Sequence, residues 1–497
     1  MNPLNKFSGG LKLTAHKLIS PINSPPLPQR LIYPLLQRAD CSAKPVVKIG
    51  ERVLKGQLIA QATDNLTVPI HAASSGIIEA IAPHNIPHAH QLESECIIIK
   101  TDGLDESVTL KPLANYKDYQ PTDLRQHIHQ AGIVGLGGAA FPTAIKLHTP
   151  EQAIHTLIIN GAECEPYISC DVALMQTYAE EIIQGALILQ YILNAPRCII
   201  ALENTQQNAY HALTNASQSH NLEIIQIPAI YPTGGEKQLI KVLTNVDIPA
   251  KALPSAYGFI CQNIGTVYAV HQAITLGLPL IERIITITGS GIKNPQNLRV
   301  RIGTPIEDLI AFCSGYHVEV EKLIMGGSMM GLSLGSDDIP VIKASNCFLA
   351  LTKNDKITAQ QSCIRCGECE QVCPVSLLPQ QLHWYSQSQQ LDLCEDYQLF
   401  DCIECGCCDV VCPSHIPLVQ QFRTAKIDIK IKQQQQDKAL LAKKRFENRQ
   451  ARLAKAEQEK QLKAEKRQAA IDKMKAAAKK KRESANPSPN PLPKGEG

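Results

Sequence analysis

The hydrophobic positions between Pro121 and about Leu280 follow two alternating patterns. Short continuous apolar runs, such as "TLIIN" and "RCIIAL", are typical of β-strands that are buried on both faces. The longer stretches between them place apolar residues at helical spacing. The pattern predicts strands at 156–160, 197–202 and 223–227, and helices at 122–131, 171–193 and 206–219. Strands that alternate with helices favour an α/β fold, a parallel sheet covered by helices on both faces.

Polar residues follow each of these predicted strands. Asn160 and Glu163 come after the first strand, Glu203 and Asn204 after the second, and 231–236 after the third. In parallel sheets, ligands bind beyond the carboxyl ends of the strands. The topology therefore predicts a binding site at this edge.

A β-rich pattern precedes this region. Between Val46 and Ile81, short β-type runs alternate with turns, as in "VVKIGERVLKGQLIAQA" and "TVPIHAASSGIIEAIAP". The pattern resembles the barrel-sandwich half-motif of biotinyl and lipoyl domains. The lysine that carries the prosthetic group in those domains is missing here, and without it the group cannot be attached. We therefore expect a structural β module.

The pattern changes again after the α/β region. From Arg283 to about Thr352, β-rich pieces such as "IITITGSGI" indicate a small β-grasp (SLBB-like) domain. Its "MGGSMMG" is interpreted as a glycine turn, with a functional loop as the alternative. Helical spacing then returns in "LLPQQLHWYSQSQQLDLCEDYQLF", which lies between two cysteine-rich stretches and favours a helical two-cluster ferredoxin domain.

These patterns predict a multidomain α/β protein with seven segments. In chain order they are an N-terminal extension (1–33), a barrel-sandwich-like β module (34–112), an α/β domain (113–282), a β-grasp domain (283–353), a ferredoxin-type domain (354–425), a basic helical segment (426–483) and a disordered tail (484–497).

The cysteine-rich stretches spell nearly the same pattern twice, as "CIRCGECEQVCP" and "CIECGCCDVVCP". Each copy reads C-x2-C-x2-C-x3-C-P, in which three thiolates hold one iron–sulfur cluster and the fourth ligates the other cluster. The spacing predicts two [4Fe-4S] clusters, one held by Cys363, Cys366, Cys369 and Cys412, the other by Cys402, Cys405, Cys408 and Cys373. Structural zinc sites typically use two separated C-x2-C pairs, so zinc fits this pattern badly. Cys407 lies off the register, and we expect it to bind no iron.

Composition and charge constrain where the chain works. The start lacks the apolar segment of a signal peptide, so we expect a reducing cytoplasm and free thiols for the other ten of the 18 cysteines. The best apolar run, 182–193, is too short for the roughly 18 residues of a membrane span. Residues 438–483 hold 17 Lys/Arg and 6 Asp/Glu, a net charge of +11, so the rest carries −8 of the total +3. A mildly acidic body therefore has a strongly basic segment.

Four further segments carry a family resemblance. They are, in order, "GIVGLGGAAFPTAIKL", "NGAECEPYISCD", "YPTGGEKQLIKVL" and "CQNIGTVYAV". The first contains G-x-G-x-x-A, which alone is a weak Rossmann signal because a helix rather than a strand precedes it. Together the four segments resemble the NADH-oxidising flavoprotein subunit of respiratory complex I. With the doubled cysteine pattern, the chain is still more similar, from Phe7 to about Ile427, to the C subunits of the Rnf (Rsx) electron-transport complex.

The resemblance implies a site for non-covalent FMN and for NAD(H) as substrate. The implied cofactor-binding residues are Gly135, Gly137, Gly138, Lys146, Asn160, Glu163, Gly234, Gly235, Glu236, Asn263 and Thr266. The implied catalytic residues are Glu163, Glu165 and Lys146; the alternative for the two glutamates is a solvated loop. Two positions depart from the complex I pattern: Leu136 replaces an arginine, and Gly235 often a glutamate. Contacts to the dinucleotide are therefore less firmly implied than those to the flavin.

The order of the modules suggests a mechanism. NADH gives up two electrons as hydride and iron–sulfur clusters accept one at a time, so a flavin belongs between them. The resemblance implies an ion-translocating NAD(H):ferredoxin oxidoreductase subunit, peripheral on the cytoplasmic side of the inner membrane. Its implied partners are the other subunits of the complex and a ferredoxin-type carrier.

Three other functions can be compared with this one. A soluble NADH-dependent flavin and iron–sulfur reductase, like the related cobalamin reductases, would share the core but need no basic tail. A non-enzymatic electron-wiring protein would lack the glycine loop. No reading motif accompanies the basic segment, so nucleic acid is not an expected partner.

Overall fold

The computed structural model describes residues 6–18, 20–38, 41–88, 92–113, 115–149, 153–353 and 359–485. The chain divides into two compact units, residues 1–423 and 424–497. The tail predicted to be disordered lies outside the described residues from 486 onward.

The N-terminal module consists of small antiparallel sheets, which confirms the β module expected from the sequence. Their orders are β2-β10-β9-β6, β5-β7-β8 and β3-β4. Ile97 and Ile99 alternate along β10 and are both fully buried, as are Val53 on β6 and Ile59 on β7. The bounds are β2 (Arg30–Pro34), β3 (Leu36–Arg38), β4 (Cys41–Ser42), β5 (Lys44–Pro45), β6 (Arg52–Val53), β7 (Leu58–Gln61), β8 (Ile70–His71), β9 (Gly76–Asn85) and β10 (Glu93–Thr101).

The α/β domain contains the predicted parallel sheet, in the order β13-β12-β11-β14. Its strands are β11 (Thr156–Gly161), β12 (Arg197–Glu203), β13 (Glu223–Ile227) and β14 (Phe259–Asn263). The order reverses direction between β11 and β14, because the chain moves outward to β13 and then returns to the other side of β11. This is the switch point at which such sheets bind ligands.

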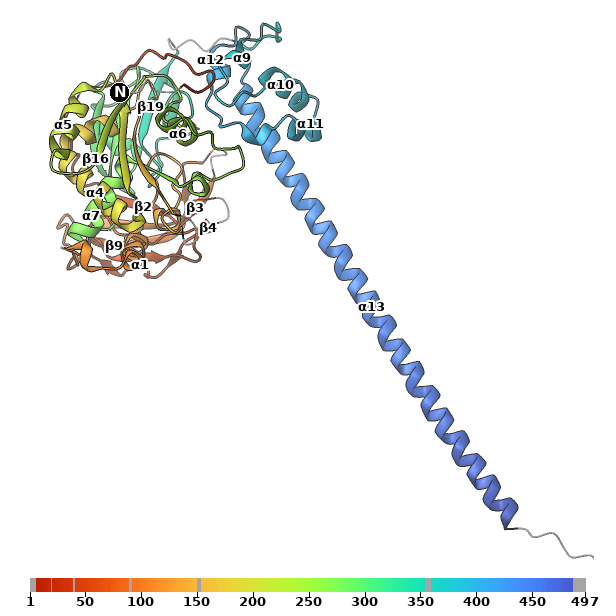
Figure 1. The fold of residues 1–497 in the computed structure, drawn as a ribbon. Coiled ribbons are helices and arrows are strands. Elements are labelled where there is room, and N and C mark those ends of the chain that lie inside the picture. The colour runs from red at the N-terminus through yellow and green to blue at the C-terminus, as the bar shows by residue number, and fades with distance from the viewer. Residues whose placement is uncertain are drawn as a thin grey trace, which may run out of the picture. The chain divides into compact units, whose positions relative to one another are not determined.

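Helices cover both faces of this sheet (Figure 1). Ile159 and Ile200 pack toward α4 and α7, whereas Ile158 and Ala201 pack against α6. Successive strand residues point to opposite faces, so both must be apolar when both faces are covered. The helices are α1 (Pro121–Gln130), α2 (Thr143–Lys146), α3 (Cys170–Thr177), α4 (Ala179–Leu193), α5 (Gln207–Ser217), α6 (Glu236–Thr244) and α7 (Ile264–Leu276), with short 3-10 turns η1 (Tyr116–Asp118) and η2 (Pro254–Tyr257).

The single helix predicted at 171–193 is wrong, because the chain breaks it into α3 and α4 at Tyr178. Tyr178 leaves helical geometry, with φ −127° and ψ 41°. Its ring packs against Tyr268, and Arg299 lies over the same ring. These partners come from distant parts of the chain, so hydrophobic spacing gives no sign of the break.

The β-grasp domain contains one mixed sheet, in the order β1-β16-β15-β19-β17-β18, with α8 (Ile306–Phe312). Its first strand, β1 (Ile22–Asn23), comes from the N-terminal segment and pairs in parallel with β16. "MGGSMMG" forms the turn between β17 and β18, where Gly326 has a φ of +100°. The remaining strands are β15 (Glu282–Thr288), β16 (Gln296–Arg301), β17 (Val320–Met325), β18 (Leu332–Leu334) and β19 (Cys347–Thr352).

The cysteine-rich domain is helical, as predicted. Its elements are α9 (Glu368–Gln371), α10 (Pro379–Gln387), α11 (Leu391–Asp396), the 3-10 turn η3 (Leu399–Asp401) and α12 (Cys407–Val410). Short helices α9 and α12 each begin after a glycine with positive φ, Gly367 and Gly406, inside the two cysteine copies. The two copies therefore have the same local backbone as well as the same spacing.

One continuous helix, α13 (Leu418–Ser484), begins at the end of the first unit and makes up nearly all of the described part of the second; it is drawn in blue in Figure 1. It contains the predicted basic segment, and each described residue from 433 to 485 is exposed. The first turns of the helix bury Leu418, Phe422 and Ile429, whereas the exposed part from 433 onward has no buried apolar stripe. Within the part of the chain that is described, no helix is both long and apolar enough to span a bilayer.

Candidate functional site

The glycine loop at 135–140 lies at the switch point of the parallel sheet. A Cβ atom added to Gly137 would lie 3.4 Å from the Cβ of Asn263, the last residue of β14. The loop connects α1 to α2, so it is positioned from outside the sheet rather than by a strand leading into it. The structure thus places the loop where the topology predicts a ligand.

Hydrogen bonds fix this loop at its base and leave its tip open. Gly135 N–H donates to the Phe141 oxygen at 2.8 Å, and Leu136 N–H donates to the Thr266 hydroxyl at 2.8 Å. Gly137 and Gly138 are exposed, and neither N–H donates to any described residue. Gly138 has a φ of +109°, which an L side chain rarely adopts. Successive free N–H groups of this kind form a concave site for anions.

Two residues expected to contact flavin take different positions beside this loop. Asn263 caps α7 by accepting from Gly265 N–H at 2.8 Å and donates to Asp171 Oδ2 at 2.6 Å. Thr266 is fully buried behind the loop, where its hydroxyl holds Leu136. Asn263 therefore lines the open side, whereas Thr266 supports the loop from the protein interior.

Asn160 and Gly234 join two of the strand ends. The Asn160 amide donates to the Gly234 oxygen at 2.8 Å and accepts from Ala162 N–H at 3.0 Å. A Cβ on Gly234 would lie 2.5 Å from the Ala162 oxygen, so a side chain does not fit there. The third-strand loop can therefore lie directly against the first-strand loop because this residue is glycine.

Lys146 and Glu236 form an ion pair at the same edge, with Nζ and Oε1 2.8 Å apart. Glu236 is the first residue of α6, and Gly235 is its N-cap. About a third of each side chain is exposed, so the pair is accessible to a ligand. The pair brings together two residues that the sequence predicted for the site.

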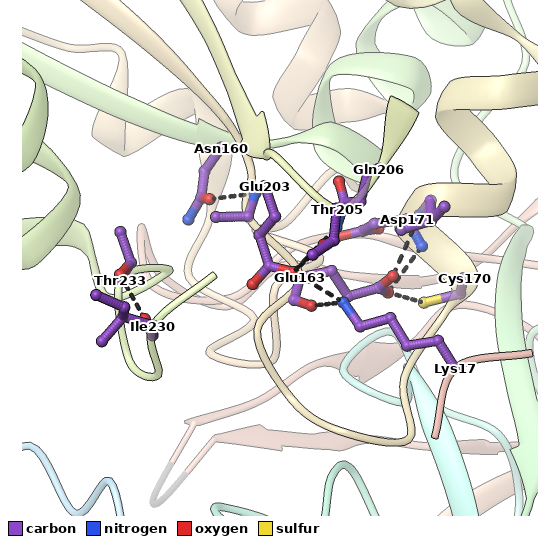
Figure 2. A network of polar contacts seen from close by, with 12 residues as sticks. Lys17, Asn160, Glu163, Cys170, Asp171, Glu203, Thr205, Gln206, Ile230 and Thr233 are labelled. Carbon is purple, nitrogen blue, oxygen red and sulfur yellow. Dashed lines mark hydrogen bonds and ion pairs between the residues drawn. The ribbon is translucent and has the colours of Figure 1, made fainter. Parts of the chain in front are cut away.

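Glu163 is a buried helix cap rather than a solvated residue. Its carboxylate accepts from Asp171 N–H at 2.9 Å and Val172 N–H at 3.2 Å, at the start of α3. Figure 2 shows Lys17 reaching from the N-terminal segment between Glu163 and Glu203. The Lys17 ammonium donates to the Glu163 main-chain oxygen and lies 3.4 Å from Glu203 Oε2. The catalytic role assigned to Glu163 stays a prediction; the contacts of its carboxylate cap the start of α3.

Glu165 connects the α/β domain to the β-grasp domain. Its carboxylate accepts from Met329 N–H at 3.1 Å and Met330 N–H at 3.0 Å, in the "MGGSMMG" turn. Burial raises the pKa of Glu165, and the two N–H bonds oppose this shift. A Cβ on Gly327 would lie 2.1 Å from the carboxylate, so this glycine permits the contact. The catalytic role predicted for Glu165 is not tested by these contacts.

Asp171 is the most perturbed carboxyl group of this site. Its pKa is raised to about 7, first by burial and then by the charge of Glu163, while the hydrogen bond from Asn263 opposes the shift. Glu203 responds in the same direction, because burial raises its pKa while Lys17 lowers it. Groups with strongly shifted pKa values gather at functional sites.

The cysteines form two groups, each with three members from one copy and one from the other. Cys363, Cys366, Cys369 and Cys412 line one cavity of about 20 Å³. In the second group, burial raises the pKa of the Cys408 thiol, as do Asp409 and the thiols of Cys402, Cys405 and Cys373. The structure thus brings together the thiols expected to hold each cluster; iron ligation itself stays a prediction.

The second cysteine group lies against the loop that carries Gly234 and Gly235. The Tyr231 hydroxyl donates to the Cys405 main-chain oxygen at 2.6 Å. The N-terminal segment crosses both elements: Leu11 pairs with Tyr231, and Gly10 N–H donates to the Val372 oxygen at 3.0 Å. Cys407 is fully buried beside Tyr231, in the same apolar cluster.

Several residues at the site are not evident from the sequence. Lys17 belongs to a segment without periodicity, so no local signal identifies it. Asp171 closes "NGAECEPYISCD", and that position is the one signal that could have singled it out. Arg283 acts through a contact 147 residues away along the chain. Tyr231 begins the predicted 231–236 stretch, but its partner Cys405, 174 residues away, is not evident from the sequence.

Four protein-family models match consecutive parts of the chain. They are the RnfC barrel sandwich hybrid domain (5–104), the Nuo51 FMN-binding domain (128–272), the SLBB domain (284–333) and the 4Fe-4S dicluster domain (359–416). Each predicted flavin contact falls within the second match, and each predicted cluster ligand within the fourth.

Curated relatives cover most of this chain. A Pseudomonas aeruginosa protein, named as the C subunit of an ion-translocating oxidoreductase complex, is 45% identical over 464 residues, which are 92% of this chain and 60% of that protein. A Vibrio cholerae protein of the same name is 43% identical, over 94% of this chain and 61% of its own length. A Yersinia pestis protein of that name is 44% identical, over 90% of this chain and 73% of its own length. The chain thus spans about three fifths of the first two relatives.

A solved structure shows a weaker likeness. An NAD+-reducing nickel–iron hydrogenase in the air-oxidized state aligns over 63% of this chain and 65% of its own, at 17% identity and a TM-score of 0.44. A score this low carries no argument about function.

Proposed function

Because the chain belongs to the RnfC family, the C subunits of ion-translocating oxidoreductase complexes, we propose that it passes electrons between NAD(H) and the other subunits of such a complex. Non-covalent FMN and two [4Fe-4S] clusters are the proposed carriers. A flavin supplies the conversion from hydride to single electrons.

The open glycine loop carries this proposal. Gly137 and Gly138 present two N–H groups that have no partner in the described part of the chain, at the switch point and beside the Lys146–Glu236 pair. This donor set fits an anionic cofactor that approaches bare backbone closely. We assign the loop to FMN and assign Asn160, Asn263 and Gly234 to the walls of the same site.

The charged side chains of this site fit the binding of the dinucleotide. Lys146 provides an accessible cation, and Glu236 orients it through their ion pair. Glu163 accepts from Asp171 N–H at the start of α3, and Glu165 accepts from Met329 N–H in the β-grasp turn. We therefore propose that both glutamates assist hydride transfer by positioning the walls of the pocket. What these residues supply is orientation and exclusion of water, which lower the barrier without changing the cofactor's own chemistry.

The order of the clusters follows from the contact between Tyr231 and Cys405. We assign the group containing Cys373 and Cys405 as the flavin-side cluster, because the loop bearing Gly234 touches it. The group containing Cys363 and Cys412 is then the exit toward a ferredoxin-type carrier or the next subunit. This order gives each electron a path through the folded body.

We propose a peripheral position on the cytoplasmic side of the inner membrane, held by partner subunits. The basic residues of 438–483 add attraction to anionic lipids, worth about 1 kcal/mol for each Lys/Arg near the surface. The names of the relatives, which describe an ion-translocating complex, support this assignment.

Flavin and iron content of the anaerobically purified chain tests the proposal. We expect about one FMN and about eight iron atoms per chain, since each cubane cluster holds about four. NADH added without oxygen should bleach the flavin absorbance and then reduce the clusters. A chain that binds iron but neither flavin nor NADH would instead be an electron-wiring protein. Full activity in a chain that never associates with membrane subunits would favour the soluble, cobalamin-reductase-like alternative.

A further inference from the structure

Arg283 reaches from the β-grasp domain into the glycine loop. It lies on β15 and is 7% exposed. Its Nη2 donates to the Leu136 main-chain oxygen at 3.1 Å, and its Nη1 donates to the Lys343 oxygen. An arginine stays charged even when buried, so its fork of N–H donors needs acceptors. Two of its acceptors are main-chain carbonyls, and one belongs to the loop.

The hydrogen bond from Arg283 to the Leu136 oxygen determines the orientation of the Leu136–Gly137 peptide group. A peptide group is planar and trans, so its C=O and N–H point to opposite sides. The Leu136 carbonyl and the Gly137 N–H belong to the same peptide group. Because Arg283 holds the carbonyl from the buried side, the Gly137 N–H is turned to the open side, where Gly137 is exposed.

Leu136 is held at both of its main-chain groups. Its N–H donates to the Thr266 hydroxyl, on α7, while its carbonyl accepts from Arg283. Neither partner lies in the loop, and both are buried. The base of the loop is therefore locked by two different domains before any ligand arrives.

A second basic side chain from the same domain holds the start of this segment. The Lys343 Nζ donates to the Gly132 oxygen at 2.7 Å and to the Pro69 oxygen at 2.9 Å. Gly132 has a φ of +70°, and a Cβ there would lie 2.4 Å from the Pro69 oxygen. The β-grasp domain thus donates hydrogen bonds to the main chain on both sides of Ile133–Gly135, at Gly132 and at Leu136.

Glycine loops need such fixing because glycine has the largest backbone freedom to lose. A ligand that must order the loop loses affinity by that entropy, and a pre-ordered loop avoids the loss. A cation on the carbonyl also polarises the peptide group, which strengthens hydrogen bonds donated by its N–H.

We propose that Arg283 is a positioning residue for the flavin loop, fixing the Leu136–Gly137 peptide so that the Gly137 N–H faces the cofactor. The inference rests on the proposed function for the identity of the ligand. It adds that the β-grasp domain is part of the flavin site, because Arg283 acts on the loop from behind while the loop's own backbone meets the cofactor.

Arg283→Met tests this role, with Arg299→Met as the matched control. Arg299 lies on the adjacent strand β16, and its hydrogen bonds go to Glu282 and Tyr178, outside the loop. Losing the hydrogen bond from a charged donor should weaken FMN binding by about ten-fold or more in Arg283→Met. The FMN dissociation constant of Arg299→Met should stay within about two-fold of wild type, although its melting temperature should fall about as much as that of Arg283→Met. FMN titration of the flavin-free chain gives the dissociation constants.

Arg283→Lys carries the test if the methionine variant does not fold. A lysine keeps the buried charge but lacks the planar fork that serves both carbonyls, so we expect a weakening of about three-fold. A purely structural role would lower the melting temperature and leave the FMN dissociation constant unchanged. Unchanged FMN affinity in both Arg283 variants would overturn the inference.

Hydrogen exchange separates this inference from the cofactor assignment. In the flavin-free chain, amide exchange across residues 133–141 should be faster in Arg283→Lys than in wild type and Arg299→Met. If wild type binds no FMN but amide exchange is still faster in Arg283→Lys, the positioning role of Arg283 stands and the assignment of the loop to FMN falls. If wild type binds FMN and exchange is the same in all three chains, the positioning falls and the cofactor assignment stands.

Discussion

The Tyr231 hydroxyl donates to the main-chain oxygen of Cys405 at 2.6 Å, and the tyrosine is 3% exposed. This bond joins the loop that follows β13 to the centre of the second cysteine copy. Burial raises the pKa of Tyr231, so the phenol stays protonated and keeps its proton to donate. The contact places the proposed flavin site and one proposed cluster on neighbouring elements of a single folded body.

Tyr231→Phe should destabilise this junction. The Cys405 carbonyl would lose its donor inside an apolar cluster, which costs about 1–3 kcal/mol in the free energy of unfolding. Anaerobic denaturant titration measures the loss. Tyr257→Phe, at a tyrosine that is 41% exposed, is the control and should change stability little. Equal stability of both variants would mean that the bond contributes nothing to the junction.

Cys373→Ser should damage the cluster expected on Cys402, Cys405 and Cys408, although Cys373 belongs to the other copy. The fourth cysteine of each copy crosses to the other cluster. In the structure, Cys373 is one of the groups that raise the pKa of the Cys408 thiol. Iron analysis and electron paramagnetic resonance of the reduced chain should show the loss of one cluster. Cys407→Ser should keep both clusters, and loss of iron there would contradict the assignment of Cys407 as a spectator.

Gly137→Val should abolish FMN binding while sparing the clusters. The valine would stand beside Asn263 and fill the space where bare backbone meets the cofactor. Flavin and iron analysis of the same preparation checks both halves of this expectation. A variant that loses iron together with flavin has unfolded more widely, and one that retains FMN places the flavin elsewhere.

Lys343 should make stability depend on pH. Burial lowers its pKa to about 7, whereas a lysine in the unfolded chain has a pKa of about 10.4. Between about pH 7 and pH 10 the unfolded chain therefore binds more protons, so stability rises with pH. The neutral amine keeps two N–H donors, enough for the Pro69 and Gly132 oxygens.

The comparison of wild type with Lys343→Met isolates this effect. Melting temperature measured from about pH 6.5 to pH 9.5 should rise in wild type relative to the variant, because only wild type carries the titrating group. Curves that run parallel over this window would show that the pKa of Lys343 is not lowered.

Truncation after Lys432 should leave the folded body intact and weaken its attachment. The described residues from 433 to 485 are exposed along their whole length, so flavin and iron content should not change. Removing the +11 segment at 438–483 should reduce sedimentation with membranes that contain the partner subunits. Added salt should likewise reduce sedimentation of the full chain with these membranes, because salt screens exposed charges. A truncated chain that sediments with these membranes as strongly as the full chain at low salt would assign the basic helix no part in attachment.

The sequence by itself determined the elements whose signal is local. Strands such as "TLIIN" and "RCIIAL" are identifiable because a doubly buried strand must be apolar at each position. The spacing of the two cysteine copies predicts which thiols come together, and the long basic helix follows from its composition. The carboxyl edge of the sheet was also predictable, because parallel topology brings strand ends together.

Tertiary structure decided what depends on residues far apart in the chain. Arg283 meets Leu136 across 147 positions, and Lys17 meets Glu203 across 186. Tyr178 breaks a helix whose spacing runs on without interruption, because Tyr268 and Arg299 hold its ring. Glu163 and Glu165 follow the end of β11, and there the Glu163 carboxylate caps α3 while the Glu165 carboxylate accepts from Met329 N–H. Periodicity records which face of an element is buried, and it contains no information about which partner covers that face.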